Sequence, residues 1–160
     1  MLCSVTLVGI VYFGGYIFNP SESAPVGIWK LDKSDKDIAL GDFVFVCPPI
    51  HPVLTQLVRD DQLLSGSCDS STTPFIKKVY GVSGQAMDAH PDHGILIDGE
   101  LIPNTKPHDW PGLEFTHGQV IKRGEFVALQ TDHYASIDSR YFGPIRKSEV
   151  IGKIKPVWVR

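Results

Sequence analysis

Short apolar runs, each closed within a few residues by glycine or proline, set the strongest limit on how this chain can fold. Fifteen glycines and twelve prolines are spread over 160 residues. Both residues mark turns and interrupt helices, so the chain can form many short strands and little helix. Its length suits one domain with a core of its own. We therefore expect a mostly β domain built from short antiparallel strands.

The alternation of apolar and polar residues locates individual elements. It predicts strands at 41–49, 75–84, 125–130 and 150–159. The Asp98-Gly99 pair between two apolar runs predicts a hairpin over 94–104 with a type I′ turn. Apolar residues at helical spacing predict one helix over 51–64, and we expect loops between these elements.

The first eighteen residues, MLCSVTLVGIVYFGGYIF, contain no charged side chain. A helix of that length would span about 27 Å, close to the thickness of a bilayer core. A cleaved signal peptide and a buried core helix are the alternatives. A signal peptide usually begins with a basic residue and ends in a small-x-small site, and neither is clear here. We expect a transmembrane anchor over 1–18 and a separate domain over 19–160, with an orientation that flanking charge does not fix.

The charge balance limits the possible partners. The net charge of −3 and the lack of a basic stripe argue against nucleic acid as a partner. His90, Asp92 and His93 form a weak candidate for a metal pair, because they lie in a Pro-Gly loop without the H-E-x-x-H spacing. Solvated loop histidines are the simpler interpretation, and we expect neither a metal nor an organic cofactor.

Two cysteines, Cys47 and Cys68, lie 21 positions apart in the domain that follows the apolar run. In an oxidising compartment they could form a disulfide, which would stabilise the fold by about 3 kcal/mol. Two buried free thiols are the alternative, and two cysteines alone make no zinc site. The disulfide is favoured only if this domain lies outside the cytoplasm.

The stretch NPSESAPVGIWKL places Ser21 and Ser23 directly after the apolar run. A serine among proline and glycine usually serves as a turn residue, and its hydroxyl is a poor nucleophile without a base nearby. His133 is one candidate base, since Asp132 and Asp138 are close to it in the sequence and a Ser-His-Asp triad can be drawn. No G-x-S-x-G motif supports that triad.

Lysine is the other candidate base. Lys77 and Lys78 are adjacent within the apolar strand pattern PFIKKVYG, so strand alternation sends them to opposite faces. A lysine on the covered face would lose solvation of its charged form, and its pKa would fall from about 10.4 toward neutrality. A neutral amine can accept a proton from a serine. The alternative is an exposed lysine pair on an edge strand.

Four segments together resemble the type I signal peptidase family. In order they are SESAPVGIW, GDFVFVCPP, PFIKKVYGVSG and ASIDSRYFGPI, with the apolar run in front of them. The first is similar to the N-x-S-x-S-x-P-x-G-x-Y pattern of the TraF-type branch, the conjugative-transfer signal peptidases. Each segment alone is weak, but four in order over nearly the whole chain make a specific signal, with DSRYFGP as the most distinctive piece.

The resemblance implies a role for individual residues. It implies that Ser23 is the nucleophile and that Lys77 is the general base, with Lys78 at the neighbouring arginine position. Ser21 would contribute its hydroxyl to the oxyanion hole, beside the backbone N–H of Ser23.

Further residues would support this dyad. Ser136 would orient the lysine amine, and an Asp138–Arg140 ion pair would hold the wall that carries it. Cysteines at the positions of Cys47 and Cys68 are also typical of the TraF-type branch.

The implied function is that of a membrane-anchored serine endopeptidase with a Ser/Lys dyad. It would cleave signal peptides or pilin precursors after a small-x-small motif, with its domain in the periplasm or otherwise outside the cytoplasm. Its partners would be the precursor protein and the lipid bilayer. The alternatives are a housekeeping signal peptidase, a non-catalytic anchored β-domain of an envelope assembly, and a LexA-type self-cleaving regulator, which would need a DNA-binding half.

Two residues and one segment depart from the family pattern. Gln85 replaces the aspartate after the lysine strand, Trp29 replaces tyrosine in the first segment, and TDHYASIDSR replaces G-D-N-x-x-x-S-x-D-S-R. These departures affect supporting positions rather than the serine or the lysine.

Overall fold

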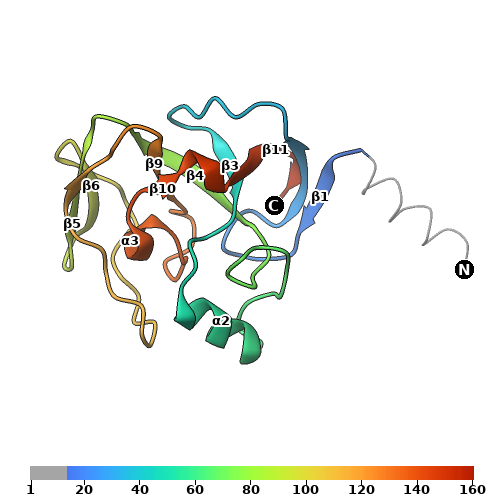
Figure 1. Cartoon of the computed structure of the whole chain (residues 1–160), viewed down its shortest axis with the longest axis horizontal. Helices are drawn as coiled ribbons and strands as arrows, with labels where there is room; N and C mark the ends of the chain where they lie inside the picture. The colour runs from blue at the N-terminus through green and yellow to red at the C-terminus, as the bar shows by residue number, and fades with distance from the viewer. Residues whose placement is uncertain (1–13) are drawn as a thin grey trace, which may run out of the picture.

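Two antiparallel β-sheets form the framework of the computed structural model, which describes residues 14–160. The larger sheet has seven strands in the order β1-β2-β11-β3-β4-β9-β10, and the smaller has four in the order β7-β6-β5-β8. The four-stranded sheet lies at one end of the molecule and β1 at the other (Figure 1). The strands are β1 (Tyr16–Asn19), β2 (Gly27–Asp32), β3 (Phe43–Val46), β4 (Phe75–Val82), β5 (Ala86–His90), β6 (Gly94–Ile97), β7 (Glu100–Leu101), β8 (Gln119–Val120), β9 (Glu125–Leu129), β10 (Ile145–Arg146) and β11 (Val150–Val159). The helices are α2 (Pro52–Arg59), α3 (Ser139–Phe142) and the 3₁₀ turn η1 (Lys147–Glu149).

The predicted strands and hairpin are confirmed. β3, β4, β9 and β11 fall inside the four predicted strand ranges, and β6 and β7 form the predicted hairpin. Asp98 and Gly99 have φ angles of 50° and 82°, as a type I′ turn requires. The helix predicted over 51–64 is shorter: α2 ends at Arg59, because Asp60 caps it and Asp61 turns into positive φ.

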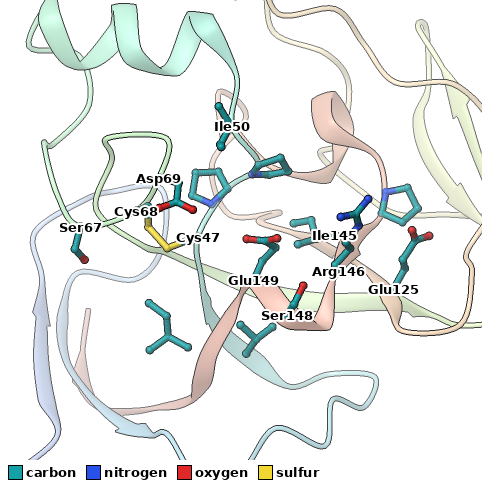
Figure 2. Close-up of a pocket in the computed structure, with 15 residues that line it drawn as sticks. Cys47, Ile50, Ser67, Cys68, Asp69, Glu125, Ile145, Arg146, Ser148 and Glu149 are labelled. Atoms are coloured by element: carbon teal, nitrogen blue, oxygen red, sulfur yellow. A yellow bond between two sulfur atoms is a disulfide. The ribbon is translucent and has the colours of Figure 1, made fainter.

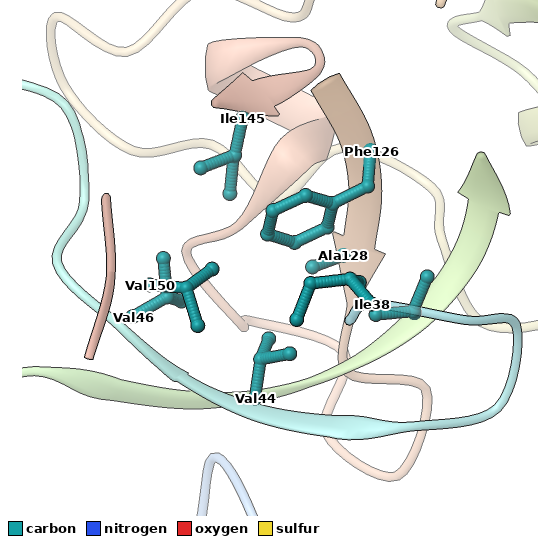
Figure 3. Close-up of a cluster of buried hydrophobic side chains, with 8 residues drawn as sticks. Ile38, Val44, Val46, Phe126, Ala128, Ile145 and Val150 are labelled. Atoms are coloured by element: carbon teal, nitrogen blue, oxygen red, sulfur yellow. The ribbon is translucent and has the colours of Figure 1, made fainter. Parts of the chain in front are cut away.

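Apolar side chains from several strands of the large sheet pack into one cluster. Ile38, Val44, Val46, Phe126, Ala128, Ile145 and Val150 converge there (Figure 3). Phe126 and Val44 have no exposed surface, so burial of this cluster holds β3, β9 and β10 together. On the other side of β3 and β4, Trp29 and Ile76 belong to a separate buried cluster. The large sheet is therefore covered on both faces around β4.

Gly27 explains the proline-glycine pattern of the first segment. It begins β2 and pairs with Val159 of β11 in the antiparallel register. Its φ is 146°, and a Cβ added there would lie 2.1 Å from the carbonyl oxygen of Trp158. Only glycine tolerates both that conformation and that contact. The residue lets β11 approach the start of β2 closely.

The predicted anchor lies mostly outside the described residues, which begin at Gly14. Over residues 14–160 no helix is long and apolar enough to cross a bilayer. Tyr16, Ile17 and Phe18, which we expected at the end of the anchor helix, instead form strand β1 with Asn19. These β-favouring residues pair with Gly27–Lys30 of β2, so their backbone hydrogen bonds are made within the sheet.

A disulfide joins Cys47, at the end of β3, to Cys68, in the loop before β4. The sequence did not decide between a disulfide and two free thiols, and the structure contains the disulfide. By loop-closure entropy, it stabilises the fold by about 3 kcal/mol. We call residues 60–74, which contain Cys68, the disulfide loop. A cavity of about 580 Å³ lies between this loop and β10, with Glu125, Arg146 and Glu149 around it (Figure 2). That cavity contains none of the serine or lysine candidates.

Candidate active site

Ser21 and Ser23 lie in the turn between β1 and β2, where the two hydroxyls meet. Their Oγ atoms are 2.9 Å apart, within hydrogen-bond distance. The backbone N–H of Ser23 also donates to Ser21 Oγ, at 3.3 Å. The O–H of Ser21 and the N–H of Ser23 are thus close together. Such a pair of donors can stabilise a developing oxyanion once a substrate oxygen replaces their mutual contacts.

Asn19 holds this turn in place, a role that we did not predict from the sequence. Its Nδ2 amide lies 2.9 Å from the carbonyl oxygen of Ser21 and 3.1 Å from those of Ala24 and Pro25. Its Oδ1 accepts from the N–H of Ser21. An asparagine two residues before a turn serine is a known turn signal, so the motif NPSESAP contained the information. The indole of Trp29 also donates to the Pro25 carbonyl, at 3.0 Å.

Lys77 is buried in the middle of β4, with 2 % of its surface exposed. Its Nζ donates to Ser136 Oγ at 2.6 Å and lies 5.3 Å from the centre of the Phe75 ring. Burial lowers the pKa of Lys77 from 10.5 to about 8, the Asp138 carboxylate opposes that change, and the Arg140 guanidinium adds to it. Lys78 points to the other face and is half-buried, as strand alternation predicted.

Asp138 and Arg140 form an ion pair behind the lysine, and neither side chain has any exposed surface. Two contacts join them: Nε to Oδ1 at 2.9 Å and Nη2 to Oδ2 at 3.1 Å. Asp138 also caps α3 by accepting from the N–H of Arg140. The remaining guanidinium hydrogens reach the backbone carbonyls of Gln130, Tyr134 and Lys106. This one residue thus ties the loop between β9 and α3, and the loop that contains Lys106, to α3.

The serines and the lysine line one cavity of about 290 Å³, which we call the serine–lysine cavity. Ser21 and Ser23 come from the β1–β2 turn and Lys77 from β4. Within residues 14–160, the hydroxyls bond to each other and not to the lysine amine. The other wall residues are Glu22, Gln62, Leu63, Phe75, Trp110, His133, Ala135 and Ile137.

A second cavity of about 400 Å³ adjoins the same serines and is mainly apolar. We call it the apolar cavity. Side chains from β1, β3, β4 and the disulfide loop line it, including Phe18, Ala24, Phe45, Leu64 and Ile76. Ser21 and Ser23 belong to both cavities, so a chain bound in the apolar cavity would pass the two hydroxyls.

The structure does not assemble the Ser-His-Asp triad drawn from the sequence. His133 does line the serine–lysine cavity, but Asp138 bonds to Arg140 and Asp132 accepts from Gln130 Nε2 at 2.9 Å. The Nδ1 of His133 is buried and has no hydrogen-bond partner in the described part of the chain. A histidine base needs a partner that orients it, which this one lacks.

The second histidine candidate was the His90–His93 pair. The two rings stack on each other at the β5–β6 turn, with centres 4.4 Å apart. Across residues 14–160 no group of three metal-ligating side chains comes together.

Comparison with known proteins identifies the family. The model of "Signal peptidase, peptidase S26" matches residues 4–159, nearly the whole chain. The chain belongs to the signal peptidase family, peptidase S26. The match includes the serine turn, the lysine strand and the Asp138–Arg140 pair.

Several relatives within this family carry TraF names. The "Probable conjugal transfer protein TraF" of Sinorhizobium fredii is 31% identical, over 98% of this chain and 84% of that protein. The "Conjugal transfer protein TraF" of Agrobacterium fabrum is 33% identical, over 99% and 89%. A "Plasmid transfer protein TraF" of Escherichia coli is 27% identical, over 96% and 89%. This signal peptidase family member is therefore of the TraF type.

A solved structure is also similar. A signal peptidase I from Enterococcus faecalis aligns over 73% of this chain and 96% of that chain, with 17% identity and a TM-score of 0.44.

Proposed function

We propose that this chain is a membrane-anchored serine endopeptidase in which Ser23 is the nucleophile and Lys77 is the general base. The observation that carries this proposal is the buried lysine: its amine shares a cavity with two adjacent serine hydroxyls, and its pKa is lowered to about 8. A lysine used only for structure would have a carboxylate partner or reach solvent. Lys77 instead contacts a neutral hydroxyl, that of Ser136.

The reaction would proceed through an acyl-enzyme. Ser23 Oγ attacks the carbonyl carbon of the scissile bond while its proton passes to Lys77 Nζ. The C–N bond then breaks, and the new α-amine leaves with that proton. A water molecule, deprotonated by Lys77, then attacks the ester; Lys77 returns that proton to Ser23 Oγ as the C–O bond breaks, and the product leaves as an acid that ionises in solvent. Ser136 holds the amine in place during both steps, and the Asp138–Arg140 pair fixes the segment that carries Ser136.

The negative charge that develops on the substrate oxygen needs donors. The O–H of Ser21 and the N–H of Ser23 already converge in the resting structure. Removing one donor of such a pair usually slows the reaction by about 10²–10³. We therefore assign Ser21 to the oxyanion hole in this proposal.

The apolar cavity supports a precursor protein as the substrate. A chain running past the serines would place small side chains against Ala24, Ile76 and Phe45. That lining has room for alanine or another small residue and little to offer a charged one. A small-x-small motif ahead of the cut fits this environment.

Exposed apolar side chains support a position at the membrane surface. Phe18 of β1 and Trp158 of β11 are 57% and 70% exposed, and both pair with Ile28 of β2, from its two sides. Tryptophan is enriched at the membrane–water interface, and an exposed phenylalanine can bury its ring in the adjoining lipid. We propose a single-pass protein of the inner membrane, with its disulfide-bonded domain in the periplasm. Because its relatives carry conjugal transfer names, we propose a pilin of the transfer apparatus as the substrate.

The test is cleavage of a pre-pilin by the full-length protein in membranes or detergent. We expect Ser23→Ala to slow processing by at least about 10⁴, since removing a nucleophile removes the covalent route. Ser83→Ala, which changes an exposed serine of the β4–β5 turn, is the matched control and should process at the parent rate. Equal processing by Ser23→Ala and the parent would refute the proposal and favour a non-catalytic anchored domain. Efficient cleavage of many unrelated secretory precursors would favour a housekeeping signal peptidase.

The pH profile gives an independent prediction. Only a neutral Lys77 accepts a proton, so kcat/KM should rise about tenfold per pH unit below a midpoint near 8 and then level off. Initial rates on a fluorogenic peptide between pH 6 and 10 measure this curve. A midpoint near the ordinary histidine value of about 6.5 would point to His133 as the base instead.

A further inference from the structure

His133 is a titratable side chain of the serine–lysine cavity that the proposed reaction does not use. It shares that cavity with Glu22, Lys77 and the two serines. Its Nδ1 is buried and, in the part of the chain that the structure describes, has no hydrogen-bond partner. A buried polar atom without a partner destabilises a fold by about 1–3 kcal/mol, so an explanation is needed.

The surroundings determine where the imidazole proton lies. A neutral imidazole carries one N–H and one bare nitrogen. Placing the hydrogen on buried Nδ1 would leave a donor with no acceptor, and a charged ring would have the same problem. The neutral form with its hydrogen on Nε2 avoids an unpaired buried donor and leaves Nδ1 as a buried acceptor without a partner in the described part of the chain. Because Nδ1 is buried, the part of the ring that can face the cavity is the edge that carries Nε2.

Aromatic neighbours hold this ring in place. It stacks on Tyr134, with planes 16° apart and centres separated by 5.3 Å. Tyr134 meets the His108 ring edge-on, and His108 meets Trp110 in the same way. The Trp110 indole donates to the Ala135 carbonyl at 3.2 Å. These contacts orient the His133 ring before any ligand arrives, with Tyr134, 68% exposed, on its outer side.

The backbone of this segment is fixed as well. The His133 carbonyl accepts from the N–H of Ser136, and the Tyr134 carbonyl accepts from Arg140. His133 therefore belongs to the same rigid turn that presents Ser136 to the lysine amine. A donor on this turn has a defined position relative to Lys77.

We propose that the Nε2–H of His133 donates a hydrogen bond to a backbone carbonyl of the bound precursor, close to the scissile bond. His133 is then a substrate-binding residue, and this assignment rests on the proposed peptidase function. The donors of the two serines serve the oxyanion, and neutral Lys77 acts as an acceptor. An extended substrate presents further carbonyl oxygens to the cavity wall, and a fixed, neutral N–H satisfies one of them at little entropic cost.

The experiment measures binding apart from chemistry. The full-length Ser23→Ala protein is titrated with a short synthetic peptide that carries alanine at the first and third positions before the cut. In that background, His133→Phe keeps a ring and removes the donor, while His133→Gln places an N–H near the position of Nε2. We expect His133→Phe to weaken the dissociation constant about tenfold and His133→Gln to restore it to within about threefold. His93→Phe, which changes a histidine on the small sheet, is the matched control and should bind as the parent does.

Two results would overturn the assignment: unchanged binding by His133→Phe, or an equal loss in His133→Gln. If the Phe variant fails to fold, the parent protein still decides the question. The imidazole ¹⁵N shifts of His133 should report the neutral Nε2–H form at pH 8 and should move when the peptide binds. An Nδ1–H form, or no response to the peptide, counts against the proposal. If the peptidase function itself is wrong, intact Ser23 will cleave no precursor, which is a separate readout.

Discussion

Replacing Lys77 by methionine should abolish precursor cleavage and at the same time make the protein more stable at pH 7. The loss of activity, by about 10⁴ or more, follows if Lys77 is the general base that we propose. The gain in stability follows from the burial of the amine. A pKa lowered from 10.5 to about 8 means that the charged form costs the native state about 3 kcal/mol at neutral pH.

Part of that gain will be lost again. In the variant, the buried hydroxyl of Ser136 loses its 2.6 Å contact with Nζ, at a cost of about 1 kcal/mol. The net gain of about 2 kcal/mol should raise the unfolding temperature by about 5 °C in a chain of this size. Calorimetry on the parent and on Lys77→Met measures it. Lys78→Met, at the next position of β4 on the opposite face, is the matched control.

The pH dependence of the stability identifies the cause. Below pH 8 the amine is protonated in both the folded and the unfolded protein, and the cost is constant. Between pH 8 and 10.5 the unfolded chain still binds the proton and the folded one does not, so the stability of the parent rises with pH. The advantage of the variant should therefore shrink across that window. A parent more stable than Lys77→Met at pH 7 would contradict this account.

Replacing Arg140 by leucine should destabilise the fold by about 3–5 kcal/mol, because it leaves the Asp138 carboxylate buried without its partner. The backbone carbonyls of Gln130 and Tyr134 also lose a donor. Urea unfolding measures the effect. The same change at Arg146, an exposed residue of β10, is the matched control and should alter stability by less than about 0.5 kcal/mol.

A double variant separates the ion pair from the rest. Adding Asp138→Asn to Arg140→Leu removes the unpaired buried charge. The double variant should therefore lose less stability than the sum of the losses of the two single variants. Additive losses, or an Arg140→Leu variant within 1 kcal/mol of the parent, would show that the buried pair is not what holds this segment.

Elements defined by local patterns were predictable from the sequence. β3, β4, β9 and β11 show alternation, and Asp98-Gly99 has the chemistry of its turn. β1, β2 and β5 were missed, because their partners decide their conformation. Tyr16–Phe18 belong to an apolar run that reads as a helix, and they become a strand only because β2 lies beside them.

The candidate site shows the same division. Motif order pointed to Ser23, Lys77, Ser136 and the Asp138–Arg140 pair. Alternation could not show which of two adjacent lysines is buried, because Ile76 and Lys77 are both covered, from opposite faces of β4. That depends on what packs on each side of the sheet. His133 was considered only as a base, since nothing in its local sequence shows that Nδ1 would be buried without a partner.

The strand order of the large sheet has a consequence for how the protein is made. β1 and β2, which flank the serine turn, connect to β3 and β4, which present the lysine, through β11. Since β11 is the last of the described strands along the chain, the serine hairpin has no neighbour on its inner side until the residues of β11 have been synthesised and have inserted. The serine turn and the lysine strand of the candidate site therefore stay apart until β11 has formed. In a peptidase, such late assembly would keep the site inactive while the chain is being made.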